Sequence, residues 1–221
     1  MQYPLLDSRL LSAAELFDIC DTGADIGADH GLLSCYLLHH NICKKMLVTD
    51  ISQDSLKKAR QLLKTHHLED RAEFIVADGL AAINRSVNCI AICGIGGRLM
   101  CNILLKGKDR LQGCPVILSC QTDLPAVRKR IYEIGYHITD EKIAYVNRRF
   151  YVIMRAEAGE KAVSEKEIFL GPVLLKGKEP VWYDYLKWRY DVIRKGSGNQ
   201  QQLKWIIEEA SDAVSDSSGC I

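Results

Sequence analysis

The sequence predicts a doubly wound α/β fold with a mostly parallel sheet, and three observations carry this prediction. Short apolar segments alternate with helical segments along residues 1–134. The apolar segments are continuously hydrophobic, which is typical of parallel strands that are buried on both faces. After Gly135, two strand-like segments follow each other directly, which predicts an antiparallel hairpin at the edge of a seven-stranded sheet.

The elements can be assigned in chain order from apolar spacing and capping residues. Residues 8–17 have the spacing of an amphipathic helix that precedes the first strand. Ser52 or Asp54 can cap the helix after the second strand. We expect parallel strands at residues 23–26, 45–50, 73–77, 89–93 and 114–120, helices at 32–40, 56–63 and 124–134, and antiparallel strands at 136–146 and 149–157.

The composition changes after residue 159 to charged, helical and aromatic segments. We therefore expect an α/β domain at residues 1–159 and a small C-terminal helical appendage, a coiled-coil-like helix pair, at residues 160–221. We expect residues 215–221 to be frayed.

Composition and cysteine usage exclude several classes of protein. Hydrophobic residues make up 48% of the 221 residues, which is enough to build a core. The chain has no run of about 18 apolar residues, and it begins without the basic segment and apolar core of a signal peptide. The nine cysteines are scattered, with no Cys-x-x-Cys pair. These features indicate a cytoplasmic protein with reduced thiols, no membrane segment and no metal site.

Charge is distributed unevenly along the chain. Residues 1–97 hold 9 Lys/Arg and 12 Asp/Glu, whereas residues 98–204 hold 20 Lys/Arg and 12 Asp/Glu. This distribution suits a cationic cofactor in one place and a polyanion along another surface. Ordinary solvated Lys and Arg side chains are the alternative explanation.

The main candidate for a ligand site is the turn Asp25-Ile26-Gly27-Ala28-Asp29-His30-Gly31. Its glycines allow a sharp bend and close approach of a ligand, and the helix that follows presents free N–H groups. The two carboxylates disfavour a bound phosphate and suit a cation or ribose hydroxyls. S-adenosylmethionine (AdoMet) carries a sulfonium, an ammonium and a ribose, so it fits the turn better than NAD does. A purely structural turn is the alternative.

Acidic residues also end the next two strands. Asp50 lies where a Rossmann-like site binds ribose hydroxyls, although it could instead be a helix N-cap. Asp78 can accept a hydrogen bond from an adenine amino group while Gly79 leaves room for the ring. The Asp-Gly pair is also common in simple turns.

The fourth strand ends in a glycine-rich segment, Cys93-Gly94-Ile95-Gly96-Gly97. Glycines at the carboxyl end of a strand permit close approach of a flat group, and the target base beside the methyl group is the best candidate. A tight strand–helix turn is the alternative. Arg98 is a candidate for phosphate contact or a solvated cap. His30 is a candidate base, but a lone histidine after a strand is more often structural.

With these motifs in view, the chain resembles the bacterial tRNA adenine-N1-methyltransferases of the TrmK family, which modify adenine 22. The resemblance covers residues 8–195. It rests on residues 25–30, on Asp78-Gly79-Leu80, on Gly94-Ile95-Gly96-Gly97 and on Tyr151-Val152-Ile153. The chain departs from the family after His30, where Gly31-Leu32-Leu33-Ser34 replaces the usual Ala-Tyr-Leu-Pro, so the aromatic ring is lost.

The resemblance implies a class I methyltransferase sheet, AdoMet as cofactor, tRNA as partner and methylation of adenine N1. It points to Asp29 as a catalytic residue that orients or deprotonates the adenine amino group. A weak homodimer stays open. The residues expected to bind the cofactor are Asp25, Gly27, Asp29, His30, Asp50, Ile51, Asp78, Gly79, Cys93 and Gly94. Those expected to bind the substrate are Gly96, Gly97 and Arg98.

Three other function classes stay open. A methyltransferase for another RNA, a protein or a small molecule would share the cofactor site. An NAD or nucleotide-sugar enzyme is disfavoured because its Gly-x-Gly-x-x-Gly turn is absent. A non-catalytic RNA-binding protein is disfavoured because Asp25, Asp50 and Asp78 are all retained.

Overall fold

The computed structural model describes residues 5–177, 179–196 and 199–216. The chain divides into two compact units, Met1–Lys161 and Ala162–Ile221. The domain boundary at residue 159 stays a prediction from composition.

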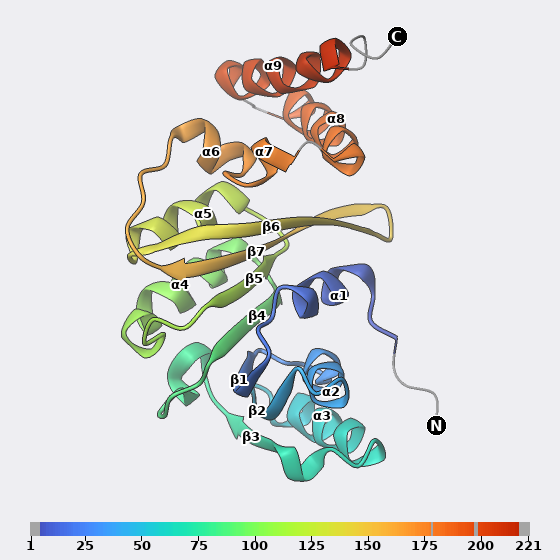
Figure 1. Ribbon diagram of the computed structural model, residues 1–221, viewed down its shortest axis with the longest axis vertical. Helices are drawn as coiled ribbons and strands as arrows, with labels where there is room; N and C mark the ends of the chain where they lie inside the picture. The colour runs from blue at the N-terminus through green and yellow to red at the C-terminus, as the bar shows by residue number, and fades with distance from the viewer. Residues whose placement is uncertain (1–4, 178, 197–198, 217–221) are drawn as a thin grey trace. The chain divides into compact units, whose positions relative to one another are not determined.

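The first unit contains a seven-stranded sheet with the order β3-β2-β1-β4-β5-β7-β6 (Figure 1). The first five strands are parallel, and β7 runs antiparallel to both β5 and β6. This confirms the doubly wound, mostly parallel sheet with a hairpin at one edge. The strands are β1 (Cys20–Ile26), β2 (Cys43–Asp50), β3 (Ala72–Val76), β4 (Cys89–Ile95), β5 (Val116–Cys120), β6 (Tyr136–Val146) and β7 (Arg149–Ala158).

Helices cover both faces of this sheet. In Figure 1, α1, α2 and α3 lie on one face, and α4 and α5 lie on the other. Their bounds are α1 (Ser8–Glu15), α2 (Leu32–His39), α3 (Gln53–Thr65), α4 (Gly97–Gly107) and α5 (Leu124–Glu133). Short 3-10 helices lie in the connections that lead into or out of strands. They are η1 (Glu69–Arg71) before β3, η2 (Gly79–Ala82) between β3 and β4, and η3 (Lys108–Arg110) before β5.

The helix starts follow local capping chemistry. The Asp7 carboxylate accepts a hydrogen bond from the Leu10 N–H at 2.8 Å and so begins α1. Of the two candidate caps for α3, the structure uses Ser52, whose hydroxyl oxygen accepts from the Ser55 N–H at 3.2 Å. These caps fix where each helix leaves the edge of the sheet.

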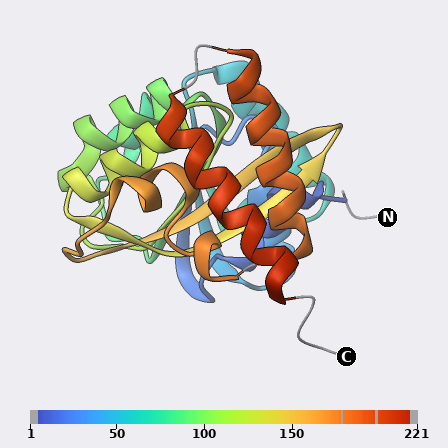
Figure 2. The same cartoon turned by 90° about the horizontal axis from the view of Figure 1, so that it is seen from above.

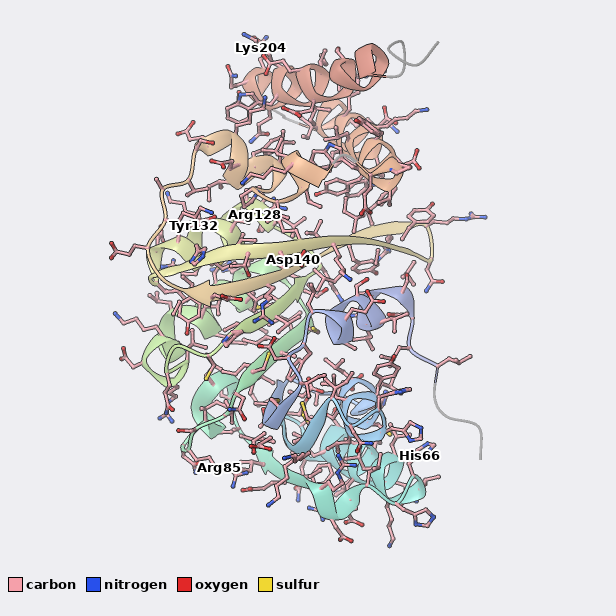
Figure 3. All side chains as sticks on the ribbon, viewed as in Figure 1. His66, Arg85, Arg128, Tyr132, Asp140 and Lys204 are labelled. Carbon is pink, nitrogen blue, oxygen red and sulfur yellow. The ribbon has the colours of Figure 1, made fainter. Side chains whose placement is uncertain are left out.

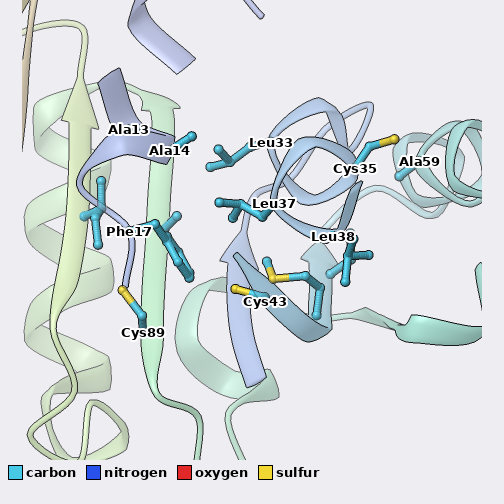
Figure 4. Packing of buried hydrophobic residues seen from close by; sticks show 14 of the residues in the cluster. Ala13, Ala14, Phe17, Leu33, Cys35, Leu37, Leu38, Cys43, Ala59 and Cys89 are labelled. Carbon is cyan, nitrogen blue, oxygen red and sulfur yellow. The ribbon is translucent and has the colours of Figure 1, made fainter. Parts of the chain in front are cut away.

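Side chains from α1, α2 and the sheet form one hydrophobic core (Figure 4). Phe17, Leu37 and Met46 are among its buried members. Gly23 of β1 leaves the room that these side chains occupy, because a Cβ at this position would lie 2.9 Å from a Phe17 ring carbon and 2.7 Å from the Met46 sulfur. The core therefore holds the start of β1 in place, and β1 leads directly into the glycine turn.

A buried ion pair joins α5 to the edge hairpin. Arg128, labelled in Figure 3, lies on α5. Its Nε donates to the Glu141 Oε1 at 2.9 Å, and both side chains are fully buried. Because charges are costly to remove from water, each of these two groups depends on the other.

The second unit is helical, with α6 (Glu165–Leu170), α7 (Leu174–Gly177), α8 (Pro180–Lys195) and α9 (Gln200–Asp216). Helices α8 and α9 form the expected helix pair (Figure 2). The Arg189 guanidinium donates to the Phe169 carbonyl oxygen at 2.9 Å and lies 4.1 Å from the centroid of the Phe169 ring, so it joins α8 to α6.

Residues 215 and 216, which the sequence predicts to be frayed, belong to α9. Residues 217–221, to which the same prediction applies, lie outside the described part of the chain. In the described residues, no helix combines the length and the apolar character that crossing a membrane requires.

Candidate functional site

The carboxyl ends of the parallel strands surround a cavity of about 670 Å³. Parallel strands end at the same edge of a sheet, which is where doubly wound folds bind their ligands. The cavity has the size typical of a small-molecule site. Its lining contains every residue that the sequence assigns to the cofactor: Asp25, Gly27, Asp29, His30, Asp50, Ile51, Asp78, Gly79, Cys93 and Gly94.

Asp25 is the most deeply buried acid in the lining, with 3% of its surface exposed. Burial raises the pKa of its carboxyl to about 6, with a smaller contribution from the nearby Asp50 charge, while hydrogen bonds from Ser34 act in the opposite direction. The Ser34 hydroxyl donates to the Asp25 Oδ2 at 2.7 Å. Ser34 of α2 therefore orients this carboxylate.

The backbone of the turn needs its two glycines. Gly27 and Gly31 have φ values of +71° and +70°, in the left-handed region that favours glycine. A Cβ on Gly31 would also lie 2.8 Å from the Cβ of Ala59 in α3. Glycine at position 31 therefore lets α3 approach the start of α2 closely.

Asp50 is held in place by the backbone of two neighbouring loops. Its Oδ2 accepts from the Asp29 N–H at 3.0 Å, and its Oδ1 accepts from the Ser52 N–H at 2.8 Å. A carboxylate oxygen can accept more than one hydrogen bond. The carboxylate is therefore oriented by the protein and keeps acceptor capacity for hydroxyl groups of a ligand.

Asp29 lies on the same side of the cavity as Asp50. Its backbone has a φ of +49°. Its Oδ1 is 3.5 Å from the Ser55 hydroxyl of α3, and its Oδ2 is 3.4 Å from the His30 Nδ1. The contacts of this carboxylate are thus with α3 and its own turn, whereas the backbone N–H of Asp29 contacts Asp50 of β2.

The end of β3 forms another part of the lining. Asp78 is exposed at the start of η2. Gly79 has a φ of +54°, and a Cβ there would lie 3.1 Å from two carbon atoms of Ile103 in α4. Gly79 therefore permits close packing of α4 as well as leaving space in the cavity.

The β4 strand ends in a bulge. Its register with β5 shifts between Cys93 and Ile95, and Gly94 at this point has a φ of +80°. The Gly94 carbonyl oxygen accepts from the Gln121 Nε2 at 3.0 Å. Burial raises the pKa of the Cys93 thiol to about 12, so this side chain is neutral at physiological pH.

Gly96, Gly97 and Arg98, which the sequence assigns to the substrate, are not in the cavity lining. Gly97 begins α4, and a Cβ on it would lie 2.2 Å from the Thr122 carbonyl oxygen. The structure thus gives Gly97 a packing role between α4 and the loop after β5. A contact of these three residues with the substrate stays a prediction.

The remaining wall comes from segments that sequence reasoning did not include. Asp7, Arg9 and Leu10 contribute from the start of α1, and Val146, Asn147 and Tyr151 from the β6–β7 hairpin. The Arg9 guanidinium carbon lies 5.6 Å from the centroid of the Tyr151 ring. Gln121, which follows β5, could have been found by the strand-end rule that identified Asp50.

The chemistry of the lining is that of a site for an uncharged or cationic ligand with hydroxyl groups. It combines a buried carboxylate, a carboxylate held by backbone N–H groups and an exposed carboxylate at the end of β3. In the part of the chain that the structure describes, no three His, Cys, Asp or Glu side chains are grouped as metal ligands.

Comparisons with known proteins agree on one family. A family model described as a methyltransferase domain matches residues 6–154. The tRNA (adenine(22)-N(1))-methyltransferase of Bacillus subtilis (strain 168) is 29% identical over 217 residues, which cover 95% of this chain and 87% of that protein.

Solved structures give the same result. Streptococcus pneumoniae Sp1610 in complex with S-adenosyl-L-methionine matches with a TM-score of 0.87 and 25% identity, covering 93% of this chain and 100% of that chain. The B. subtilis M1A22 tRNA methyltransferase TrmK matches with a TM-score of 0.75 and 26% identity, covering 94% and 95%.

Proposed function

This chain belongs to the methyltransferase domain family, and on that premise we propose that it transfers the methyl group of AdoMet to N1 of adenine 22 in tRNA. The observation that carries the proposal is the meeting of Asp25, Asp50 and Asp78 at one cavity, on the ends of three neighbouring strands. The curated B. subtilis relative, similar over 95% of this chain, is named for this reaction.

The residues of the cavity fit AdoMet. Asp25 supplies a negative charge in a desolvated position, which suits the ammonium or the sulfonium of the cofactor. Asp50 supplies acceptors for the ribose hydroxyls, and Asp78 supplies an acceptor for the adenine amino group. The bound cofactor supplies an electrophilic methyl group on a positively charged sulfur.

The reaction needs orientation more than acid–base chemistry. Adenine N1 forms a bond to the methyl carbon as the carbon–sulfur bond breaks, and the positive charge moves from the sulfur to the base. The protein contributes by holding the two reactants in line, which can account for much of the rate enhancement. N1 is normally paired or stacked in RNA, so the target base has to leave the RNA fold to reach the cavity.

The direct test is incubation of the purified protein with labelled AdoMet and bulk tRNA, followed by nucleoside analysis. We expect 1-methyladenosine to appear, and mapping of the modified tRNA should place it at position 22. Labelled tRNA that contains a different methylated nucleoside would contradict the proposed target. Binding of AdoMet without methylation of any tRNA would contradict the proposed substrate.

The role of Asp29 can be separated by comparing turnover with cofactor affinity. The sequence-based hypothesis of a catalytic Asp29 expects Asp29→Ala to lower kcat far more than AdoMet affinity. The Asp29 carboxylate lies near the Ser55 hydroxyl, and the Asp29 backbone N–H donates to Asp50, the proposed ribose acceptor; these contacts favour a role in orienting the cofactor. We therefore expect comparable losses of about tenfold in both quantities. Asp70→Ala, an exposed acid outside the cavity, is the matched control.

AdoMet affinity should depend on pH through Asp25. Its pKa of about 6 means that the carboxyl is largely protonated below that pH. A cationic ligand favours the ionised form, so binding at low pH has to release this proton. We expect the affinity measured by calorimetry to rise about tenfold from pH 5 to pH 7. Asp25→Asn should bind weakly with a flat profile over this range, and an unchanged slope in that variant would assign the pH dependence to another group.

We further propose that the helical appendage and the basic later half of the chain hold the body of the tRNA. Trp188 is the most exposed of the five aromatic residues on α8, and it is the best candidate there for base stacking. Phosphate contacts predict a steep fall in tRNA affinity with rising salt. A flat salt response would argue against them. Since tRNA is the proposed substrate, we place the enzyme in the cytoplasm.

A further inference from the structure

The bulge at the end of β4 exposes a backbone carbonyl that the loop after β5 satisfies. The Gln121 N–H donates to the Ile95 carbonyl oxygen at 2.9 Å, and the Gln121 Nε2 donates to the Gly94 carbonyl oxygen at 3.0 Å. Gln121 is therefore attached to the end of β4 through both its backbone and its side chain. This double attachment fixes the position of the amide in the cavity lining.

The attachment also fixes which atom of the amide remains for a ligand. A carbonyl oxygen can only accept a hydrogen bond, so the nitrogen of the Gln121 amide has to face Gly94. The Oε1 atom is then the acceptor that remains. It belongs to a part of the lining separate from Asp29 and Asp50, which lie at the ends of β1 and β2.

We propose that the Gln121 Oε1 accepts a hydrogen bond from the 6-amino group of the target adenine and so selects adenine over other purines. The proposal rests on the proposed function, because it assigns the base that this cavity receives. Guanine and hypoxanthine carry an oxygen at position 6, which would face the Gln121 oxygen with two acceptors in opposition. A purine without a 6-substituent would leave the Gln121 oxygen without a partner.

The orientation of the Gln121 amide determines whether the site favours a 6-amino or a 6-oxo group on the target base. If the amide were free to turn, its nitrogen could serve a 6-oxo group equally well, and glutamine would not discriminate. The hydrogen bond to the Gly94 carbonyl oxygen disfavours that rotation. Selectivity for a 6-amino group is therefore linked to the bulge in β4, and Gln121 is a specificity-determining residue.

The test compares two tRNAs that differ only at the target position, which holds either adenosine or purine riboside. For the unmodified enzyme and for Gln121→Met, kcat/KM is measured on both tRNAs. The two bases differ in the intrinsic reactivity of N1, but this difference is common to both enzymes and cancels when the ratios are compared. We expect the preference for adenosine to be about tenfold smaller in Gln121→Met.

Two further variants separate selection from structural support. Gln121→Glu keeps an acceptor but, when ionised, cannot donate to Gly94, so it should lose rate on both tRNAs and retain the preference for adenosine. Gln61→Met makes the same side-chain change at an exposed position on α3 outside the cavity, and it should behave like the unmodified enzyme. AdoMet affinity, measured for every variant, reports whether the fold and the cofactor site are intact.

The outcomes are distinct. An unchanged adenosine preference in Gln121→Met would overturn the inference and leave Gln121 as support for the bulge. If Gln121→Met fails to fold, loss of the preference in Gln121→Glu would overturn the inference. Failure of the unmodified enzyme to methylate adenosine in native tRNA would instead refute the proposed function.

Discussion

Asp50→Ala is expected to weaken AdoMet binding by about a hundredfold, the largest loss that we expect from one substitution in the cavity. The substitution removes the acceptor proposed for the ribose hydroxyls. It also leaves the N–H groups of Asp29 and Ser52 without the carboxylate that they now contact at 3.0 Å and 2.8 Å. Calorimetry with AdoMet and with its demethylated product would measure the loss.

Asp54→Ala is the matched control for this experiment. Asp54 lies four positions further along the chain, is exposed and pairs with Lys57 at 2.9 Å on the surface of α3. It carries the same charge and does not line the cavity. AdoMet affinity within twofold of the unmodified protein is expected for this control. A similar loss in both variants would indicate a general charge effect, and an Asp50 variant with normal affinity would contradict the ribose assignment.

Arg128→Met is expected to lower the free energy of unfolding by about 3–5 kcal/mol. The substitution removes the guanidinium and leaves the buried Glu141 carboxylate without this partner. Chemical denaturation of the first unit, monitored in the full chain, would measure the change. The effect should be on stability, because neither residue lines the cavity.

The double variant Arg128→Met/Glu141→Leu tests the reason for this loss. Replacing both charges with apolar side chains also removes the buried Glu141 charge, so most of the lost stability should return. Lys129→Met, at the neighbouring exposed position on α5, is the control and should change stability little. A double variant as unstable as Arg128→Met would show that packing around Arg128, and not the charge on Glu141, causes the loss.

Local sequence was sufficient for the sheet, because each parallel strand is a short apolar run and the two antiparallel strands follow each other directly after Gly135. The expected helices did not include α4. Local sequence was also sufficient to find Asp25, Asp50 and Asp78, since parallel strands end at one edge of a sheet. It could not show that Ser34 donates to Asp25, because a serine on an apolar helix carries no sign of its partner. The meeting of those acids in one cavity is a consequence of strand order.

The part of the cavity lining that comes from α1 and the β6–β7 hairpin could not be predicted, for a different reason. Arg9 and Tyr151 are more than a hundred positions apart in the chain, and the cavity brings them together through the pairing of the edge hairpin with β5. The periodic pattern of apolar residues in the sequence does not show which hairpin residue faces a ligand. The bulge at Gly94 was equally hidden, because a register shift is a property of two strands and not of one sequence segment.

The placement of the hairpin has a consequence for biogenesis. Strands β1 to β3 and the turns that follow them supply Asp25, Asp29, Asp50 and Asp78, but the hairpin residues Val146, Asn147 and Tyr151 emerge from the ribosome later and complete the cavity lining. A nascent chain that ends before β6 therefore carries the carboxylates without the enclosure. We therefore expect a fragment that ends before β6 to hold a small ligand less tightly than the complete first unit does.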